Sequence, residues 1–186
     1  MNVTPLAVSE WDPMLASIAN DMRGRPLNVH KLMANHPDLL VAWWNLRNHA
    51  VSGGALRQRH RELIILRVAV YMKSWYEWAS HVERGLKAGI SIDEIEQIRS
   101  GALESDWDVG DSLLLRATGE CLQDKKISPG TLADLSRHFD PTQVMDLITI
   151  CGVYTILGTM INTWGLELDD FIELPGEVME DRWLES

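Results

Sequence analysis

Apolar residues recur at intervals of three and four along most of this chain, which is the spacing that places them on one face of an α-helix. Runs that alternate apolar and polar residues, as half-buried strands do, are not evident. The pattern predicts an all-α protein, folded as a single-domain helical bundle. We expect helices over residues 14–22, 57–72, 91–100, 109–123, 129–138 and 140–164, of which the last is the longest. Residues 29–34 form a short turn or helix. One further helix begins at Pro37, and another ends near Gly89.

Residues at the expected helix ends support this pattern. Asp12-Pro13 and Asp140-Pro141 each combine an N-cap Asp with a Pro at the first helical position. Ser91 and Glu94 have the spacing of a capping box. Gly89 suits the left-handed conformation in which many helices end.

We expect three segments along the chain. Residues 1–36 form an N-terminal helical extension, residues 37–164 form the central helical domain, and residues 165–186 form an acidic tail. This tail is interrupted by Pro and Gly and is a candidate for an arm that lies across a neighbouring subunit.

Composition narrows the classes of function. The chain has 186 residues, is 46% hydrophobic, and carries a net charge of −10, which disfavours a nucleic-acid partner because phosphate contacts need clustered Lys and Arg. No signal peptide is evident, and the most apolar stretch, 144–161, is interrupted by polar residues. Cys121 and Cys151 each lie in an apolar helical pattern, so we interpret them as reduced core thiols. We expect a soluble cytoplasmic protein without a membrane partner.

Candidate chemistry gathers between residues 74 and 81. On a helix, Ser74, Glu77 and His81 lie on one side because they are separated by three and four residues. A Glu77–His81 hydrogen bond within one helix would orient the imidazole for proton transfer. The alternative is structural: Ser-x-x-Glu is also the pattern of a capping box at a helix start.

Glu62 opens the most apolar helix, where a carboxylate is costly to bury without a partner. That partner could belong to the site or could be a neighbouring arginine, namely Arg59, Arg61 or Arg67. A metal site built from Glu62, Glu77 and His81 is a third alternative, although no recognised ligand spacing is present. Trp78 lies on the same helix face as His81 and is the candidate pocket wall. The remaining histidines are expected at the surface: His30, His36, His49, His60 and His138.

Together these residues resemble a known family. The runs 61–67, 76–81 and 89–95 are similar to the carboxymuconolactone decarboxylase family, which includes alkylhydroperoxidase D. The resemblance covers residues 37–123 and extends more loosely to 153–155 and Asn162. It implies a helical fold of the alkylhydroperoxidase D type, no cofactor, and a homotrimer or a hexamer built from trimers.

The resemblance also bears on the chemistry. Peroxidases of this family carry Cys residues 12 and 15 positions after the Glu and a His 19 positions after it. Counted from Glu62, these positions hold Ser74, Glu77 and His81 here, so both thiols are replaced. Thiol-based peroxide reduction is therefore disfavoured, since it needs a thiolate and a resolving thiol.

The sequence predicts a cofactor-independent enzyme that moves protons on a small organic acid or lactone, with decarboxylation (a lyase reaction) or isomerisation as the outcome. Glu62, Glu77 and His81 are the expected catalytic residues, and no metal is expected. Ser74 and Trp78 are expected to contact substrate, and Arg61 or Arg67 could hold its carboxylate. The alternative is a non-catalytic oligomeric binding or scaffold protein with the same fold.

Overall fold

The computed structural model describes residues 2–23, 25–101 and 107–173. Within these ranges the regular structure is helical throughout, which confirms the all-α prediction. The longer helices are α1 (Ala16–Asp21), α2 (Asn28–Met33), α3 (Pro37–Asn48), α4 (Gln58–Met72), α5 (Trp75–Lys87), α6 (Ile92–Ser100), α7 (Val109–Gln123), α8 (Pro129–Leu135) and α9 (Pro141–Trp164). Short 3₁₀ turns at Val8–Glu10 and Pro13–Leu15 precede α1, and a π-helical turn at His49–Gly53 follows α3.

The expected caps form at most helix ends. Asp12 and Asp140 accept backbone hydrogen bonds at their helix starts, and Ser91 and Glu94 form the reciprocal capping box of α6. Two ends differ from the sequence prediction. The helix expected over 14–22 is split, because its first turn is a 3₁₀ turn. The α-helix expected over 129–138 ends at Leu135. The backbone N–H groups of the next residues, Arg137 and His138, donate to carbonyl oxygens three residues earlier, as in a 3₁₀ turn.

Helix α4 is the central element of the fold. It packs most extensively against α5, α7 and α9. Ile64, Ile65 and Val68 join a core cluster that includes α9, whereas Leu63 and Leu66 join a second cluster with α5 and α6. Five consecutive residues of α4, from Glu62 to Leu66, are buried, whereas Arg61 and Arg67 are partly exposed. Glu62 therefore has to find its partner inside the protein.

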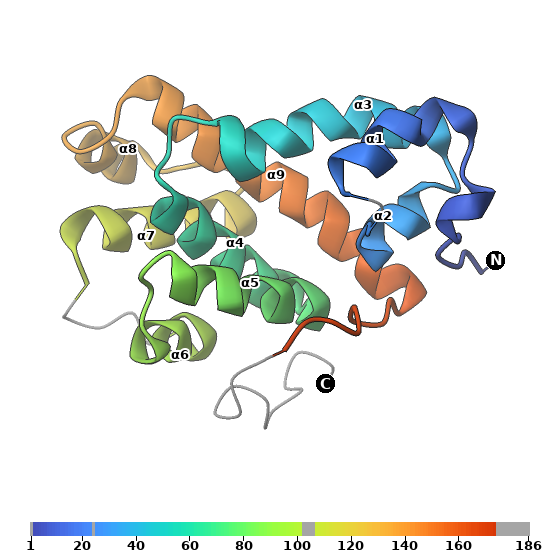
Figure 1. Ribbon diagram of the computed structural model, residues 1–186. Helices are drawn as coiled ribbons and strands as arrows, with labels where there is room; N and C mark the ends of the chain where they lie inside the picture. The colour runs from blue at the N-terminus through green and yellow to red at the C-terminus, as the bar shows by residue number, and fades with distance from the viewer. Residues whose placement is uncertain (1, 24, 102–106, 174–186) are drawn as a thin grey trace.

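Helix α9 crosses the middle of the molecule, with α3 on one side and α5 on the other (Figure 1). Its length and its mean hydropathy of 1.8 over an 18-residue window would by themselves permit a membrane span, and 56% of that window is buried inside the fold. Core helices of the same composition also meet these criteria. Asp146, one of the polar residues that interrupt this stretch, is buried against the segment that follows α3.

The described part of the C-terminal segment returns to the body of the same chain. Asp169 is 3% exposed and accepts hydrogen bonds from the Tyr76 hydroxyl of α5 and from the Asn28 backbone N–H of α2, the latter at 2.9 Å. Burial and the neighbouring carboxylate raise the pKa of Tyr76, so the phenol remains a donor. The arm expected across a neighbouring subunit would involve residues 174–186, which lie outside the described ranges.

Replacing Asp169 by Ala should lower the free energy of unfolding by about 1–3 kcal/mol, because two buried donors lose their acceptor. Urea unfolding followed by circular dichroism measures the change. The exposed neighbour provides the control, and Asp170→Ala should have little effect. Equal stability of the two variants would show that Asp169 does not anchor the segment.

Candidate active site

A buried hydrogen bond between α4 and α5 organises the site. His81 Nδ1 lies 2.7 Å from Glu62 Oε2, and the two residues are 4% and 5% exposed. The Glu62 carboxylate can only accept, so the ring donates through Nδ1–H and keeps a lone pair on Nε2. On the Nε2 side, Nη1 of Arg84 lies 3.5 Å away. Tyr154 of α9 packs edge-on against the ring, with centroids 5.1 Å apart.

This arrangement answers two questions that the sequence left open. The partner of Glu62 is His81 and not an arginine, because Arg59 pairs with Glu94 and Asp111 instead. Arg61 donates to the Leu56 carbonyl, and Arg67 donates to the Ile98 carbonyl and the Tyr71 hydroxyl. Neither Arg61 nor Arg67 lines the cavity described below, so the suggestion that they hold a substrate carboxylate is not supported.

The second carboxyl group, Glu77, is buried without a hydrogen-bond partner. It is 3% exposed, and neither of its oxygens bonds to another described residue. The expected Glu77–His81 hydrogen bond is therefore absent from the described structure. Burial raises the pKa of Glu77 well above its ordinary value, because an isolated carboxylate is poorly solvated there. Burial therefore favours the neutral, protonated form of Glu77.

The same burial acts in the opposite direction on the histidine. Desolvation lowers the pKa of His81, and the nearby Arg84 charge adds to this, while Glu62 raises it in part. The imidazole is therefore favoured in its neutral form, with the lone pair of Nε2 on the side of Arg84 Nη1. One environment holds a neutral acid and a neutral base within one turn of α5.

Glu77 and His81 share a small cavity of about 30 Å³. This volume accommodates one or two water molecules, since a water needs roughly 10–15 Å³ on this measure. Its wall is part polar and part apolar, and helices α2, α3, α5 and α9 contribute to it. The lining residues are Leu27, Val29, His30, Arg47, Tyr76, Glu77, Ser80, His81, Arg84, Tyr154, Leu157 and Ile161.

The two predicted substrate contacts lie elsewhere. Trp78 is fully buried in the second core cluster and does not line the cavity, so its position is that of a packing residue and not of a pocket wall. Ser74 is also fully buried and outside the lining. It is the N-cap residue of α5 by position, yet its side chain makes no capping bond, so the capping-box alternative is wrong. Its hydroxyl has no hydrogen-bond partner among the described residues.

The cavity includes polar residues that the sequence did not single out. His30 of α2 is 2% exposed, its ring packs edge-on against Trp44, and burial lowers its pKa to about 3. Ser80 is buried, and its hydroxyl has no partner among the described residues. The expectation that His30 and His60 are surface residues is wrong, since His60 is 4% exposed. Nothing local marks His30, because its burial depends on α3.

Two further features concern metal and thiol chemistry. Over the described ranges, no group of three or more His, Cys, Asp or Glu side chains is arranged to hold a metal ion, so the metal alternative gains no support. Cys121 and Cys151 are free thiols that interact between α7 and α9, away from the cavity. The contact with Cys121 raises the pKa of the Cys151 thiol, and burial adds to this effect.

Residues 37–107 match the family described as "Carboxymuconolactone decarboxylase family". Over this segment the chain is similar to that family. It contains α3 to α6, and with them Glu62, Glu77, His81 and both arginines of the cavity. No curated protein matches the whole sequence significantly.

Solved structures share the fold over nearly the entire chain. The alkylhydroperoxidase AhpD core of an uncharacterised peroxidase-related protein from Ralstonia eutropha JMP134 is 20% identical, with a TM-score of 0.77 and coverage of 94% of this chain and 95% of that one. A peroxidase-related protein from Silicibacter sp. TM1040 is 16% identical, with a TM-score of 0.75 and coverage of 92% and 95%. The debrominase Bmp8, in complex with 2,3,4-tribromopyrrole, is 14% identical, with a TM-score of 0.75 and coverage of 91% and 92%. At these identities the likeness establishes the alkylhydroperoxidase D-like fold.

The position of Glu77 depends on a glycine of α9. A Cβ atom at Gly158 would lie 2.9 Å from Glu77 Oε2 and 3.2 Å from the Met72 Cβ. Gly158→Ala should therefore destabilise the protein by about 1–3 kcal/mol through overpacking and should displace the carboxyl group. Thermal unfolding tests this.

The matched control for this variant is on the same helix. Gly152→Ala meets no atom within 4 Å. It should raise stability by about 0.5–1 kcal/mol, because alanine is the better helix former. Similar effects of the two substitutions would contradict the close contact at Gly158.

The raised pKa of Glu77 predicts a pH-dependent stability. The native state holds this proton more tightly than the unfolded chain does, so the stabilisation is complete below the ordinary glutamate pKa and is lost as the pH rises through the raised pKa. Each unit of pKa difference corresponds to about 1.4 kcal/mol. Between about pH 5 and about pH 8, the wild type should lose more stability than Glu77→Gln, which has no proton to lose.

Urea unfolding at several pH values measures this difference. Glu83→Gln, on the exposed side of the same helix, should retain the wild-type pH dependence. Parallel curves for the wild type and Glu77→Gln would show that the carboxyl group ionises normally.

Proposed function

We propose that this chain is a cofactor-independent enzyme that transfers protons on a small organic acid or lactone, with decarboxylation or isomerisation as the outcome. One observation carries the proposal: His81, fixed through Nδ1 by Glu62, shares a buried cavity with the unpartnered Glu77. A neutral base and a neutral acid facing one cavity are what acid/base catalysis near neutral pH requires.

In this mechanism His81 Nε2 takes a proton from the substrate, and the Glu62 carboxylate stabilises the resulting imidazolium. Glu77 donates its proton at another atom of the substrate, and the two groups return to their starting forms by exchange with water or with each other. In a decarboxylation, the electron pair of the broken C–C bond remains on the substrate carbon, CO₂ leaves, and Glu77 or the imidazolium protonates that carbon.

Thiol chemistry is disfavoured at this site. The family resemblance aligns Ser74 and Glu77 with the peroxidase cysteines, and Cys121 and Cys151 lie outside the cavity lining. The structural relatives named as peroxidase-related proteins and as a debrominase therefore support a shared fold and not a shared reaction. Ser74 and Glu77, which take the place of the two thiols, favour acid/base chemistry.

Substitution of His81 by Asn should reduce kcat/KM about 10²–10⁴-fold on a panel of lactone acids, because this range is typical for loss of a general acid or base. Glu62→Gln should reduce it to a smaller extent, because the ring keeps a partner but the imidazolium loses its counter-charge. Steady-state kinetics with purified protein provides the measurement.

The control is a histidine at the surface. His138 is exposed on the segment after α8, and His138→Asn should keep full activity. Unchanged turnover in both His81→Asn and Glu62→Gln would remove these residues from the mechanism.

The alternative is a non-catalytic binding or scaffold protein, and the small volume of the cavity favours it. The unpartnered state of Glu77 favours the enzyme, since a purely structural core has no reason to retain an unsatisfied buried acid. Formation of any product from the substrate panel would exclude the scaffold.

We also propose that the protein is a cytoplasmic homo-oligomer, a trimer or a hexamer, as the family resemblance implies. An uncharged, exposed face of α9 supports an assembly, since Met145, Ile148 and Ile156 are 66%, 50% and 46% exposed. Light scattering in solution distinguishes a trimer or hexamer from a monomer, and a monomer at micromolar concentration would contradict the assembly.

A further inference from the structure

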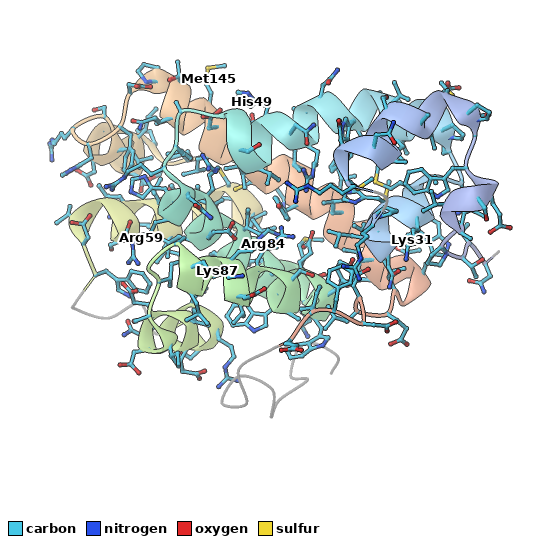
Figure 2. The ribbon with its side chains drawn as sticks, viewed as in Figure 1. Lys31, His49, Arg59, Arg84, Lys87 and Met145 are labelled. Atoms are coloured by element: carbon cyan, nitrogen blue, oxygen red, sulfur yellow. The ribbon has the colours of Figure 1, made fainter. Side chains whose placement is uncertain are left out.

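Two arginines from different helices meet at the cavity. Arg47 comes from the last turn of α3 and Arg84 from the last turn of α5, and both are half-buried. Figure 2 shows Arg84 on the side of α5 that faces the middle of the molecule, with Lys87 one turn further along the helix. The sequence analysis predicts no role for Arg47 or Arg84.

Neither guanidinium has a carboxylate partner among the described residues. Arg47 donates to the Asn48 side-chain oxygen at 2.9 Å and stacks over Trp44, with its Cζ 5.1 Å from the ring centroid. Arg84 has the long contact of 3.5 Å with His81 Nε2. In contrast, Arg59 on α4 is fully committed to two carboxylates.

The balance of charge around the cavity is therefore positive. Among the described residues that line the cavity, Glu77 is the one acidic residue, and burial favours its neutral form. Glu62 does not line the cavity, and its carboxylate accepts a hydrogen bond from His81. Burial lowers the pKa of Arg47, and the like charge of Arg84 contributes in the same direction. Two like charges in a partly buried wall are costly unless an anion lies between them.

We propose that Arg47 and Arg84 bind the carboxylate group of the small organic acid on which this site acts. A guanidinium matches the planar, two-oxygen geometry of a carboxylate, with which it can form two parallel hydrogen bonds. Apolar residues of α9, Leu157 and Ile161, complete the wall and suit the hydrocarbon part of the ligand. The carboxylate is a substrate group only if the proposed function holds; the anion site itself does not depend on it.

The arginines also place the bound acid with respect to the chemistry. Arg84 lies three residues after His81, so the two side chains project from adjacent positions on one face of α5. An acid held by Arg84 presents its neighbouring carbon atoms to His81 Nε2 and to Glu77. Because both arginines are half-buried, their side chains can move outward to admit a ligand larger than the empty cavity.

Calorimetric titration with acetate and with acetamide, at constant ionic strength, tests the anion site. The two probes have nearly the same shape and differ in charge. Wild-type protein should bind acetate and prefer it over acetamide by at least tenfold. Arg84→Gln and Arg47→Gln should each weaken acetate binding about 10–100-fold, the range for a lost hydrogen bond to a charged group, and leave acetamide unchanged.

Two variants serve as controls. Lys87→Gln removes the same charge from an exposed position of α5 and should bind acetate as the wild type does. Arg84→Lys keeps the charge and should retain much of the affinity, which separates lost recognition from misfolding. Equal affinity for acetate and acetamide, or acetate binding that survives both Arg→Gln substitutions, would overturn the proposal.

The same titration with His81→Asn separates the two proposals. Retained acetate binding together with wild-type turnover in this variant would remove the proton-transfer mechanism and leave the anion site intact. Lost turnover in His81→Asn together with absent acetate preference in the wild type would support the mechanism and overturn the anion site.

Discussion

The hydrogen bond between Glu62 and His81 is the constraint from which the site follows. Glu62 lies in the buried stretch of helix α4, where a carboxylate is tolerated only with a partner, and α5 supplies that partner. The bond fixes the rotation of α5 against α4 and the tautomer of the imidazole. Once His81 is fixed, helical spacing places Glu77 one turn earlier and Arg84 one turn later, so three chemically different groups line one cavity.

Desolvation then sets the chemistry of this cavity. A single physical cause raises the pKa of Glu77 and lowers that of His81, because burial disfavours the charged form of each. An acid and a base that would exchange a proton in water can therefore both remain neutral beside each other. Gly158 contributes by leaving room for the Glu77 carboxyl group against α9. A glycine at position 158 of α9 is thus a requirement of the site.

The sequence predicted what depends on local pattern. Helical periodicity gave the all-α fold, and Asp12, Ser91 and Asp140 marked helix starts because capping is a contact between near neighbours. The family resemblance aligned Glu62 and His81 with the Glu and His of the peroxidases, and in the structure these two side chains share a hydrogen bond.

Local pattern was misleading where long-range contacts decide. Ser74 and Glu77 have the spacing of a capping box, but both side chains are buried in the tertiary fold and form no capping bond. Trp78 shares a helix face with His81 by sequence, yet it packs into the core between α4 and α6. Arg47 and His30 come from helices far from α5 in sequence, so only the tertiary fold reveals that they reach the cavity.

The polar groups that are buried around the cavity destabilise the fold, and this is itself an argument for function. Glu77, Ser80 and His30 each bury a polar atom without a partner among the described residues, and the contacts that the described residues make with Arg47 and Arg84 include no carboxylate. Folding alone would favour replacing these groups by apolar side chains of similar size. Polar groups that converge unsatisfied on one small cavity instead form a preorganised environment, in which a ligand supplies the missing partners and solvent does not have to be reorganised. A ligand that satisfies all of them carries a negative charge for the arginines, a proton acceptor for Glu77 and an acidic proton for His81, which is the description of a small organic acid.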